Sequence, residues 1–292
     1  MRKLSFTVPI EYNNCTIKAF LRGPCGLSAR LMIRLKYEPL GITKNGIHAR
    51  VIETVKTNDV ICIVIPDDTK SIEPVSLPLS LLYEDDDFLV VDKQPNMPIY
   101  PTPGHDKDSL ANAVSAYYQQ KNQQIAFRPL FRLDKDTTGI VVLAKNSYSA
   151  FACSQKISKK YIAVCEGELK GTGTICHPIQ KKEGHRIQRE VNPLGERAVT
   201  HYRVLSASHN HSLVEFQLET GRTHQIRVHM SFIGHPLAGD DFYGGSRAYI
   251  HRQALHCSFA EWIHPVTQEQ ILIKSPYHVD MQELIYSLNL TV

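Results

Sequence analysis

The apolar residues among the first 66 positions recur with spacings that predict short elements. A helix is expected over 29–36, where apolar residues share one face and Ser28 can cap the first turn. Asn45-Gly46 is the strongest two-residue hairpin signal and predicts a hairpin over 42–51. The alternating stretch 60–65 predicts a strand. Together these elements predict a small α/β unit at the N-terminus.

The longer C-terminal part of the chain alternates strand-like runs with few helices. A hairpin is expected over 81–92, with acidic residues at its bend. Helices are expected over 109–120, capped by Asp108 or Ser109, and over 224–233, capped by Thr223. Four more strands are expected at 139–144, 160–166, 200–206 and 213–219. This order favours an α+β fold built on a mixed, largely antiparallel sheet.

A linker is expected between these two parts. The stretch PDDTKSIEPVSLP, from Pro66 to Pro78, has three prolines, several charges and little periodicity. The sequence therefore predicts an N-terminal module over 1–66, a linker over 67–78 and a larger domain over 79–292.

Composition places the chain among globular proteins. Apolar residues make up 42% of the 292 residues and charged residues 21%, and no tract reads as a membrane span. The first ten residues do not form a secretory signal. Seven scattered cysteines include no C-x-x-C pair and read as buried thiols in a reducing compartment. We therefore expect a cytoplasmic protein with no membrane contact.

Charge is distributed unevenly along the chain. Residues 1–66 hold ten Lys/Arg and four Asp/Glu, a formal charge of +6, which leaves −2 for the remainder of a chain whose total is +4. A cationic module suits a polyanion, because neutralised phosphates release their counterions. Arg30 and Arg34, one turn apart on the expected helix, are candidate RNA-binding residues. A basic surface that serves solubility alone is the alternative.

The run FRLDKDTTG, from Phe131 to Gly139, places an acid at a turn directly before an apolar strand. Asp134 stands near Arg132, and the turn residues that follow would fix its direction. We take Asp134 as the candidate nucleophile. The alternative is that Asp134 and Asp136 only end a loop, as Asp often does.

The stretch ETGRTHQIRVHMSFIGHPLAGDDFYG, from Glu219 to Gly244, is rich in residues that chemistry uses. Arg222 stands at the expected helix start, where a cation gains nothing from the helix dipole. A specific anion explains it better, either Asp134 or a phosphate. A purely structural ion pair is the alternative.

Taken together, FRLDKDTTG, KKYIAVCEG and GRTHQIRVH with the GHPLAGD and YG that follow closely resemble the RluA-type family of pseudouridine synthases. The resemblance extends to LYEDDDFLVVDKQPNMPIYP near the start of the larger domain and to ALHCSFAEWIHPVT near its end. It implies the pseudouridine synthase fold for residues 79–292. Helices followed by a hairpin with a basic face also resemble the S4-type RNA-binding module in residues 1–66.

The resemblance assigns roles to individual residues. Asp134 matches the catalytic aspartate of the R-L-D motif, and Arg132 is the arginine two residues before it. Tyr161 matches the tyrosine that packs on the target base, and Leu255 the aliphatic residue that lines the uracil pocket. Arg222 matches the arginine that pairs with the aspartate. Among the motif positions, Phe131 departs from the family's usual His.

The implied reaction isomerises uridine in RNA. It breaks the bond from N1 to C1′ and forms one from C5 to C1′, so no metal, nucleotide or redox cofactor is needed. Asp134 either attacks C1′ or takes the 2′ proton to give a glycal, and a nearby guanidinium would keep it ionised. The uridine must leave its stack, and Arg132 can fill the vacated space. A structured loop of ribosomal or transfer RNA is the expected partner of a monomeric enzyme.

Three other functions compete with this one. A metal-dependent hydrolase would use His224, His229, His235, Asp240 and Asp241. However, the first two histidines are five positions apart and would not share the helix face that i, i+4 ligands need. A retaining glycosidase would pair Asp134 with Asp136, although nearby cations oppose the raised pKa that its acid needs. The third is an RNA-binding protein without catalysis. Which RNA and which uridine are the targets stays open.

Overall fold

The computed structural model describes residues 1–67, 72–208 and 210–290. Residues 1–65 form a small unit with its own four-stranded sheet in the order β1-β4-β2-β3. Its core side chains, among them Leu4, Phe20 and Ile63, form a separate apolar cluster. The elements are β1 (Arg2–Thr7), α1 (Ile17–Arg22), α2 (Ala29–Lys36), β2 (Ile42–Lys44), β3 (Ile47–His48) and β4 (Val60–Ile65).

The local predictions for this unit are confirmed. Helix α2 has the predicted bounds, and the Ser28 hydroxyl accepts a hydrogen bond from the Leu31 amide at 3.1 Å. Asn45 and Gly46 both have positive φ and join β2 to β3. Strand β1 was not predicted, and it pairs with β4, whose first residue lies far along the chain.

The body is a nine-stranded mixed sheet in the order β5-β6-β7-β14-β8-β13-β12-β9, with β15 beside β14. Every strand pair is antiparallel except β7 with β14, so the predicted α+β class with a largely antiparallel sheet is confirmed. The strands are β5 (Ser80–Glu84), β6 (Phe88–Lys93), β7 (Thr138–Ala144), β8 (Ser158–Glu166), β9 (Thr172–Cys176), β12 (Val199–Ser208), β13 (His211–Leu218), β14 (Leu255–Ile263) and β15 (Gln270–Lys274).

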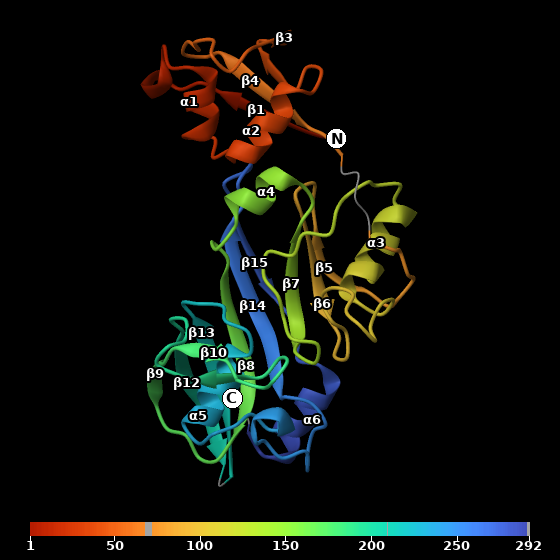
Figure 1. Ribbon diagram of the computed structural model, residues 1–292, viewed down its shortest axis with the longest axis vertical. Helices are drawn as coiled ribbons and strands as arrows, with labels where there is room; N and C mark the ends of the chain where they lie inside the picture. The colour runs from red at the N-terminus through yellow and green to blue at the C-terminus, as the bar shows by residue number, and fades with distance from the viewer. Residues whose placement is uncertain (68–71, 209, 291–292) are drawn as a thin grey trace.

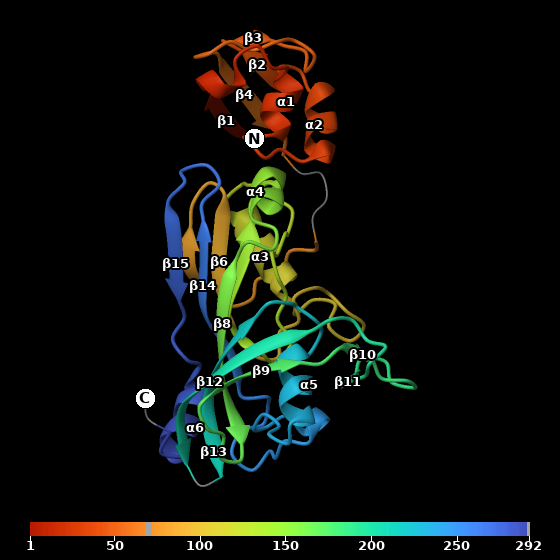
Figure 2. The same cartoon turned by 90° about the vertical axis from the view of Figure 1, so that its left-hand side faces the viewer.

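Helices and a hairpin complete the body. Figure 1 shows α3 beside β5 and β6, and α6 at the lower end of the sheet. Figure 2 shows the β10–β11 hairpin reaching away from the sheet. Every residue of β7 is buried, because both faces of this strand are covered, and its sequence is accordingly apolar without alternation. The elements are α3 (Leu110–Gln120), α4 (Ser147–Ala152), β10 (Ile179–Lys181), β11 (Arg189–Val191), α5 (Gln225–Phe232) and α6 (Val279–Ser287).

The N-terminal unit docks on the α4 end of the body (Figure 1). Arg2 donates to the Asp87 carboxylate at 2.7 and 3.3 Å, and Asp87 is almost fully buried. Tyr148 of α4 packs in the core of the N-terminal unit and meets Phe6 edge to face. Burial by itself would raise the pKa of Asp87, but the hydrogen bonds from Arg2, Asn146 and Ser149 and the charge of Arg2 together outweigh it, and the pKa is lowered.

The predicted linker lies partly outside the described residues. Residues 67 and 72–78 form neither helix nor strand. The Asn112 side chain of α3 donates to the Glu73 carbonyl at 2.8 Å, which holds the end of this segment against the body. In the described parts of the chain, no helix combines the length and the apolar character that crossing a membrane requires.

Candidate active site

Asp134 lies in a tight turn directly before β7. The Thr137 amide donates to the Asp134 carbonyl at 3.1 Å, and β7 begins one residue later. Gly139 has φ +103°, and a Cβ atom there would stand 2.3 Å from the Cys257 carbonyl oxygen of β14. Only glycine permits this close strand approach. The Asp134 side chain keeps 25% of its surface exposed, so a substrate can reach it.

A buried lysine holds this turn. The Lys93 ammonium donates to the carbonyl oxygens of Gln94, Met97 and Lys135, at 2.9, 3.0 and 2.7 Å. Burial lowers the pKa of Lys93 to about 7. The sequence alone did not single out this residue, because a Lys at the end of a strand usually reaches solvent.

Arg227 is the arginine that pairs with Asp134. Its Nη1 lies 3.0 Å from Asp134 Oδ2, while Nε and Nη2 donate to Asp240 at 2.6 and 2.8 Å. The guanidinium also lies 5.0 Å from the Tyr243 ring centroid. Burial opposes its charge, but the hydrogen bond to Asp240 and the charge of Asp134 raise the pKa of Arg227. The result is a permanent cation that orients Asp134, with all three guanidinium nitrogens engaged in hydrogen bonds.

The predicted pairing of Arg222 with Asp134 is wrong. Arg222 donates to the Glu196 carboxylate and, through Nε, to the Arg197 carbonyl at 3.0 Å. Its side chain is 38% exposed, whereas that of Arg227 is 8% exposed. Helix α5 begins only at Gln225, so Arg222 stands outside the helix and is turned toward the loop that contains Glu196.

The cap of this helix also differs from the prediction. The cap residue is His224 in the left-handed conformation, with φ 59° and no side-chain cap hydrogen bond, so Thr223 is not the cap. The Gln225 carboxamide oxygen instead accepts from the Arg222 amide at 3.0 Å. A sequence signal for Arg227 did exist, because a cation between apolar neighbours on a helix needs a buried carboxylate partner.

Tyr161 and Leu255 lie on neighbouring strands and face the same apolar core. Strand β8 pairs with β14 so that Tyr161 lies opposite Cys257, and Leu255 opposite Ala163. Both side chains are about nine-tenths buried or more. Burial is the largest cause that raises the pKa of Tyr161, and the charge of Asp134 adds to it. Tyr161 therefore remains a neutral ring at the site, suited to packing rather than to proton transfer.

His224 is a further neighbour of Asp134. Its Nε2 lies 3.8 Å from Asp134 Oδ2, and its Nδ1 lies 2.8 Å from the Tyr243 hydroxyl. Burial lowers the pKa of His224, so the ring is neutral near pH 7. Sequence reasoning considered His224 only as a metal ligand and missed this position.

The candidate metal ligands of the rival hydrolase are not gathered at one place in the described residues. His229 uses both ring nitrogens, at 2.9 Å from Thr200 Oγ1 and from the His177 carbonyl oxygen. Across residues 1–67, 72–208 and 210–290, no three His, Cys, Asp or Glu side chains are placed to hold a metal ion. Asp136 accepts from the Asn96 amide at 3.1 Å and so shapes the loop.

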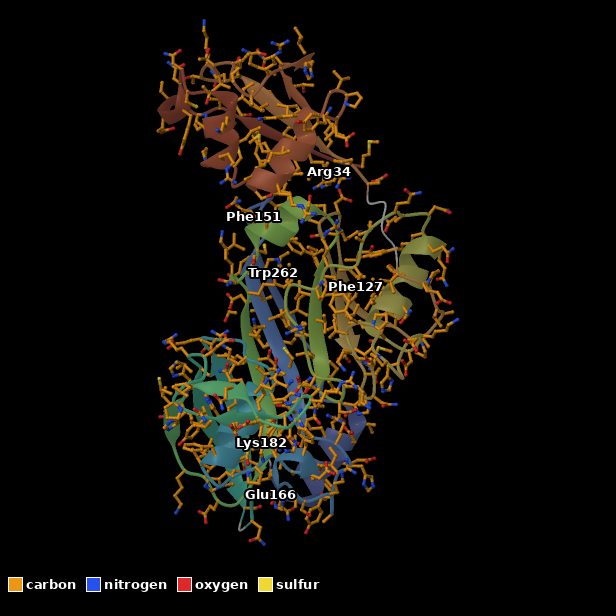
Figure 3. The ribbon with its side chains drawn as sticks, in the orientation of Figure 1. Arg34, Phe127, Phe151, Glu166, Lys182 and Trp262 are labelled. Carbon is orange, nitrogen blue, oxygen red and sulfur yellow. The ribbon has the colours of Figure 1, made fainter. Side chains whose placement is uncertain are left out.

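The remaining predicted residues line the approach to the site or lie far from it. Arg132 is exposed beside Asp134, and its charge counteracts the raised pKa of Tyr100. Arg30 is exposed on α2, and Arg34 donates to the Asp67 carbonyl at 2.9 Å. Figure 3 shows Arg34 on the edge of the N-terminal unit nearest the body. The charge of Asp134 thus acts on Tyr161, which shares an apolar cluster with Leu255, whereas Arg30 and Arg34 lie on the separate N-terminal unit.

Comparisons with known proteins point to one family of RNA-modifying enzymes. A family model described as RNA pseudouridylate synthase matches residues 87–232. The uncharacterized RNA pseudouridine synthase YjbO of Bacillus subtilis is 39% identical over 284 residues, which cover 94% of this chain and 99% of that protein. Ribosomal large subunit pseudouridine synthase D of Escherichia coli K12 is 36% identical over 232 residues, 73% of this chain and 71% of that protein. Human RNA pseudouridylate synthase domain containing 1 superposes with a TM-score of 0.57 at 27% identity, over 72% of this chain and 86% of that chain.

Proposed function

This chain belongs to the RNA pseudouridine synthase family, of the RluA type, and on that premise we propose that Asp134 is its catalytic carboxylate and that ribosomal RNA is its substrate. The enzyme isomerises uridine in RNA to pseudouridine. The observation that carries the assignment of Asp134 is its 3.0 Å contact with the buried Arg227 at a turn that solvent can reach.

The geometry supports a division of labour within the site. Arg227 aims Asp134 and places a positive charge beside it, because Asp240 fixes the other side of the guanidinium. Asp134 then attacks C1′ or takes the 2′ proton, and the C1′–N1 bond breaks. Tyr161 and Leu255 offer apolar walls between which the freed base can turn. C5 then bonds to C1′ as the Asp134–C1′ bond breaks or, in the glycal route, as Asp134 returns the proton to C2′. C5 loses its proton, and the freed N1 gains one.

The proposed RNA target follows from named relatives. Several proteins called ribosomal large subunit pseudouridine synthase D are 36–37% identical to this chain over nearly three quarters of its length or more. Arg132, exposed beside Asp134, is proposed to occupy the space that the flipped uridine vacates. Transfer RNA is the second candidate, since a structured loop with an accessible uridine meets the same chemical requirement.

We propose that residues 1–66 act as an S4-like RNA-binding module joined by the linker 67–78 to the catalytic domain 79–292. The positive charge of this module and the exposure of Arg30 support RNA binding. The docking of Arg2 on Asp87 supports a fixed orientation of the module. The protein is further proposed to be a cytoplasmic monomer that needs no metal. Size-exclusion chromatography tests the monomeric state, and activity assays with a chelator test the independence from metal.

Replacing Asp134 with Asn tests the assignment. We expect Asp134→Asn to abolish pseudouridine formation in a ribosomal RNA fragment while the dissociation constant for RNA stays within about threefold. Asp136→Asn is the matched control, because Asp136 serves the neighbouring loop. Wild-type activity in Asp134→Asn would refute the assignment. Mapping pseudouridines in total RNA from cells with and without the protein identifies the target uridine.

A further inference from the structure

The active-site face of β8 holds a cation that the mechanism above does not use. Side chains alternate along a strand, so Lys159 and Tyr161 point to one face while Lys160 points to the other. Lys160 lies 3.4 Å from Glu215 on that opposite face and lines the cavity there. Lys159 is therefore the lysine of this pair that shares a face with Tyr161.

Lys159 has an apolar surrounding and no compensating acid. Its Nζ lies 4.6 Å from the centroid of the Phe131 ring, three positions before Asp134. Within the part of the chain that the structure describes, no carboxylate lies within ion-pair distance of this ammonium. Burial lowers the pKa of Lys159. A half-buried, unpaired cation costs free energy, which an anion bound beside it would offset.

The groups around Lys159 cannot supply that anion. Burial raises the pKa of the Cys257 thiol to about 12 and that of Tyr161 well above its usual value, so both stay neutral near pH 7. Asp134 is already engaged by Arg227. The missing anion must therefore come from the substrate.

The proposed reaction itself produces an anion, the detached uracil. When the C1′–N1 bond breaks, its electron pair stays on N1, and uracil leaves with a negative charge spread over N1, O2 and O4. This holds whether Asp134 has bonded to C1′ or has taken the 2′ proton. Arg227 directs its Nε, Nη1 and Nη2 to two carboxylates, so it is not free to neutralise the base.

We propose that Lys159 is a catalytic residue that places its ammonium beside the departing uracil and neutralises the charge that develops on it. The inference rests on the proposed roles of Asp134 and Tyr161. Residues two apart on a strand lie about 7 Å from each other, so the four-carbon stem of Lys159 reaches a base packed on Tyr161. Removing one such stabilising group lowers a catalytic rate about 10²- to 10³-fold.

The first experiment compares Lys159→Met with Lys160→Met, which alters the same strand on the opposite face. Single-turnover rates are measured on saturating RNA, and RNA dissociation constants in parallel. We expect the Lys159→Met rate to fall about 10²- to 10³-fold with the dissociation constant within about threefold, and Lys160→Met to stay near wild type. Lys159→Arg retains a positive charge and should recover most of the rate. It also keeps the test open if Lys159→Met does not fold.

The second experiment changes the leaving group. In RNA with 5-fluorouridine at the target position, fluorine stabilises the uracil anion, so the loss of Lys159 should matter less. We expect the Lys159→Met defect in the rate of C1′–N1 cleavage to be at least about tenfold smaller than with uridine. An equal defect on both substrates, or a defect in RNA affinity alone, would overturn the inference. Wild-type behaviour of Lys159→Met overturns only this inference, whereas activity in Asp134→Asn overturns the proposed function.

Discussion

Replacing Arg227 with Met removes the cation that lies between two carboxylates. Asp240 would remain with 1% of its side chain exposed and without the two hydrogen bonds of 2.6 and 2.8 Å that now compensate it. Leaving one partner of a buried ion pair uncompensated costs about 3–5 kcal/mol. We expect Arg227→Met to lower the free energy of unfolding by that amount, measured by urea denaturation near pH 7.

A second substitution separates stability from catalysis. Exchanging a buried ion pair for apolar residues is often neutral. The double variant Arg227→Met with Asp240→Leu should therefore recover to within about 2 kcal/mol of the wild-type stability. Its activity should not recover, because Asp134 still lacks the hydrogen bond from Arg227. A hydrogen bond to a charged group contributes about 1.5–3 kcal/mol, which corresponds to about a ten- to hundredfold loss of rate.

Arg222→Met is the matched comparison. Arg222 is partly exposed and pairs with Glu196, whose side chain is 70% exposed, so its loss should cost less than about 1 kcal/mol. The single-turnover rate on saturating RNA should stay within about threefold of wild type. If Arg222→Met lost as much rate as Arg227→Met, or if the double variant regained activity, the assignment of the Asp134 partner would be refuted.

Three further outcomes are expected. Gly139→Ala should lower the free energy of unfolding by at least about 2 kcal/mol, because the new Cβ meets the β14 backbone. Gly221→Ala, whose Cβ would have no atom within 4 Å, should leave it unchanged, and equal urea midpoints for the two variants would contradict this. Burial lowers the pKa of His256 to about 4, so the unfolded chain binds the proton of this histidine more tightly than the folded chain does. The free energy of unfolding should therefore fall by about 3 kcal/mol as pH drops from about 6.5 to about 4. If His256→Gln kept the same dependence of stability on pH, this reasoning would be wrong. Arg2→Ala should release the N-terminal unit and enlarge the radius of gyration in small-angle scattering, while Lys3→Ala should not; equal radii would argue against the docking role of Arg2.

Local signals in the sequence predicted much of the fold. The caps at Ser28 and Ser109 and the Asn45-Gly46 turn each act within a few residues, and the structure confirms them. Strand β14 was not predicted, because its partners β7 and β8 lie about a hundred residues or more before it. Pairing over such distances depends on the assembled sheet rather than on local preference.

The site was predicted only in part, because some of its contacts join residues that are distant in the sequence. Asp134 carries its own turn signal, whereas Tyr161 and Leu255 were expected at the site only because the sequence resembles the RluA-type family. The partner was wrongly assigned to Arg222. The apolar neighbours of Arg227 indicated a buried carboxylate partner, but Asp134 stands 93 positions away and meets Arg227 only in the assembled fold.

Lys93 recognises main-chain oxygens alone, a feature common to every amino acid. The side chain of Lys135 is consequently irrelevant to how this anchor works, and Arg132 stands outside these three contacts. Substitutions at these two positions could therefore change which RNA is preferred while the Asp134 carboxylate between them keeps its position.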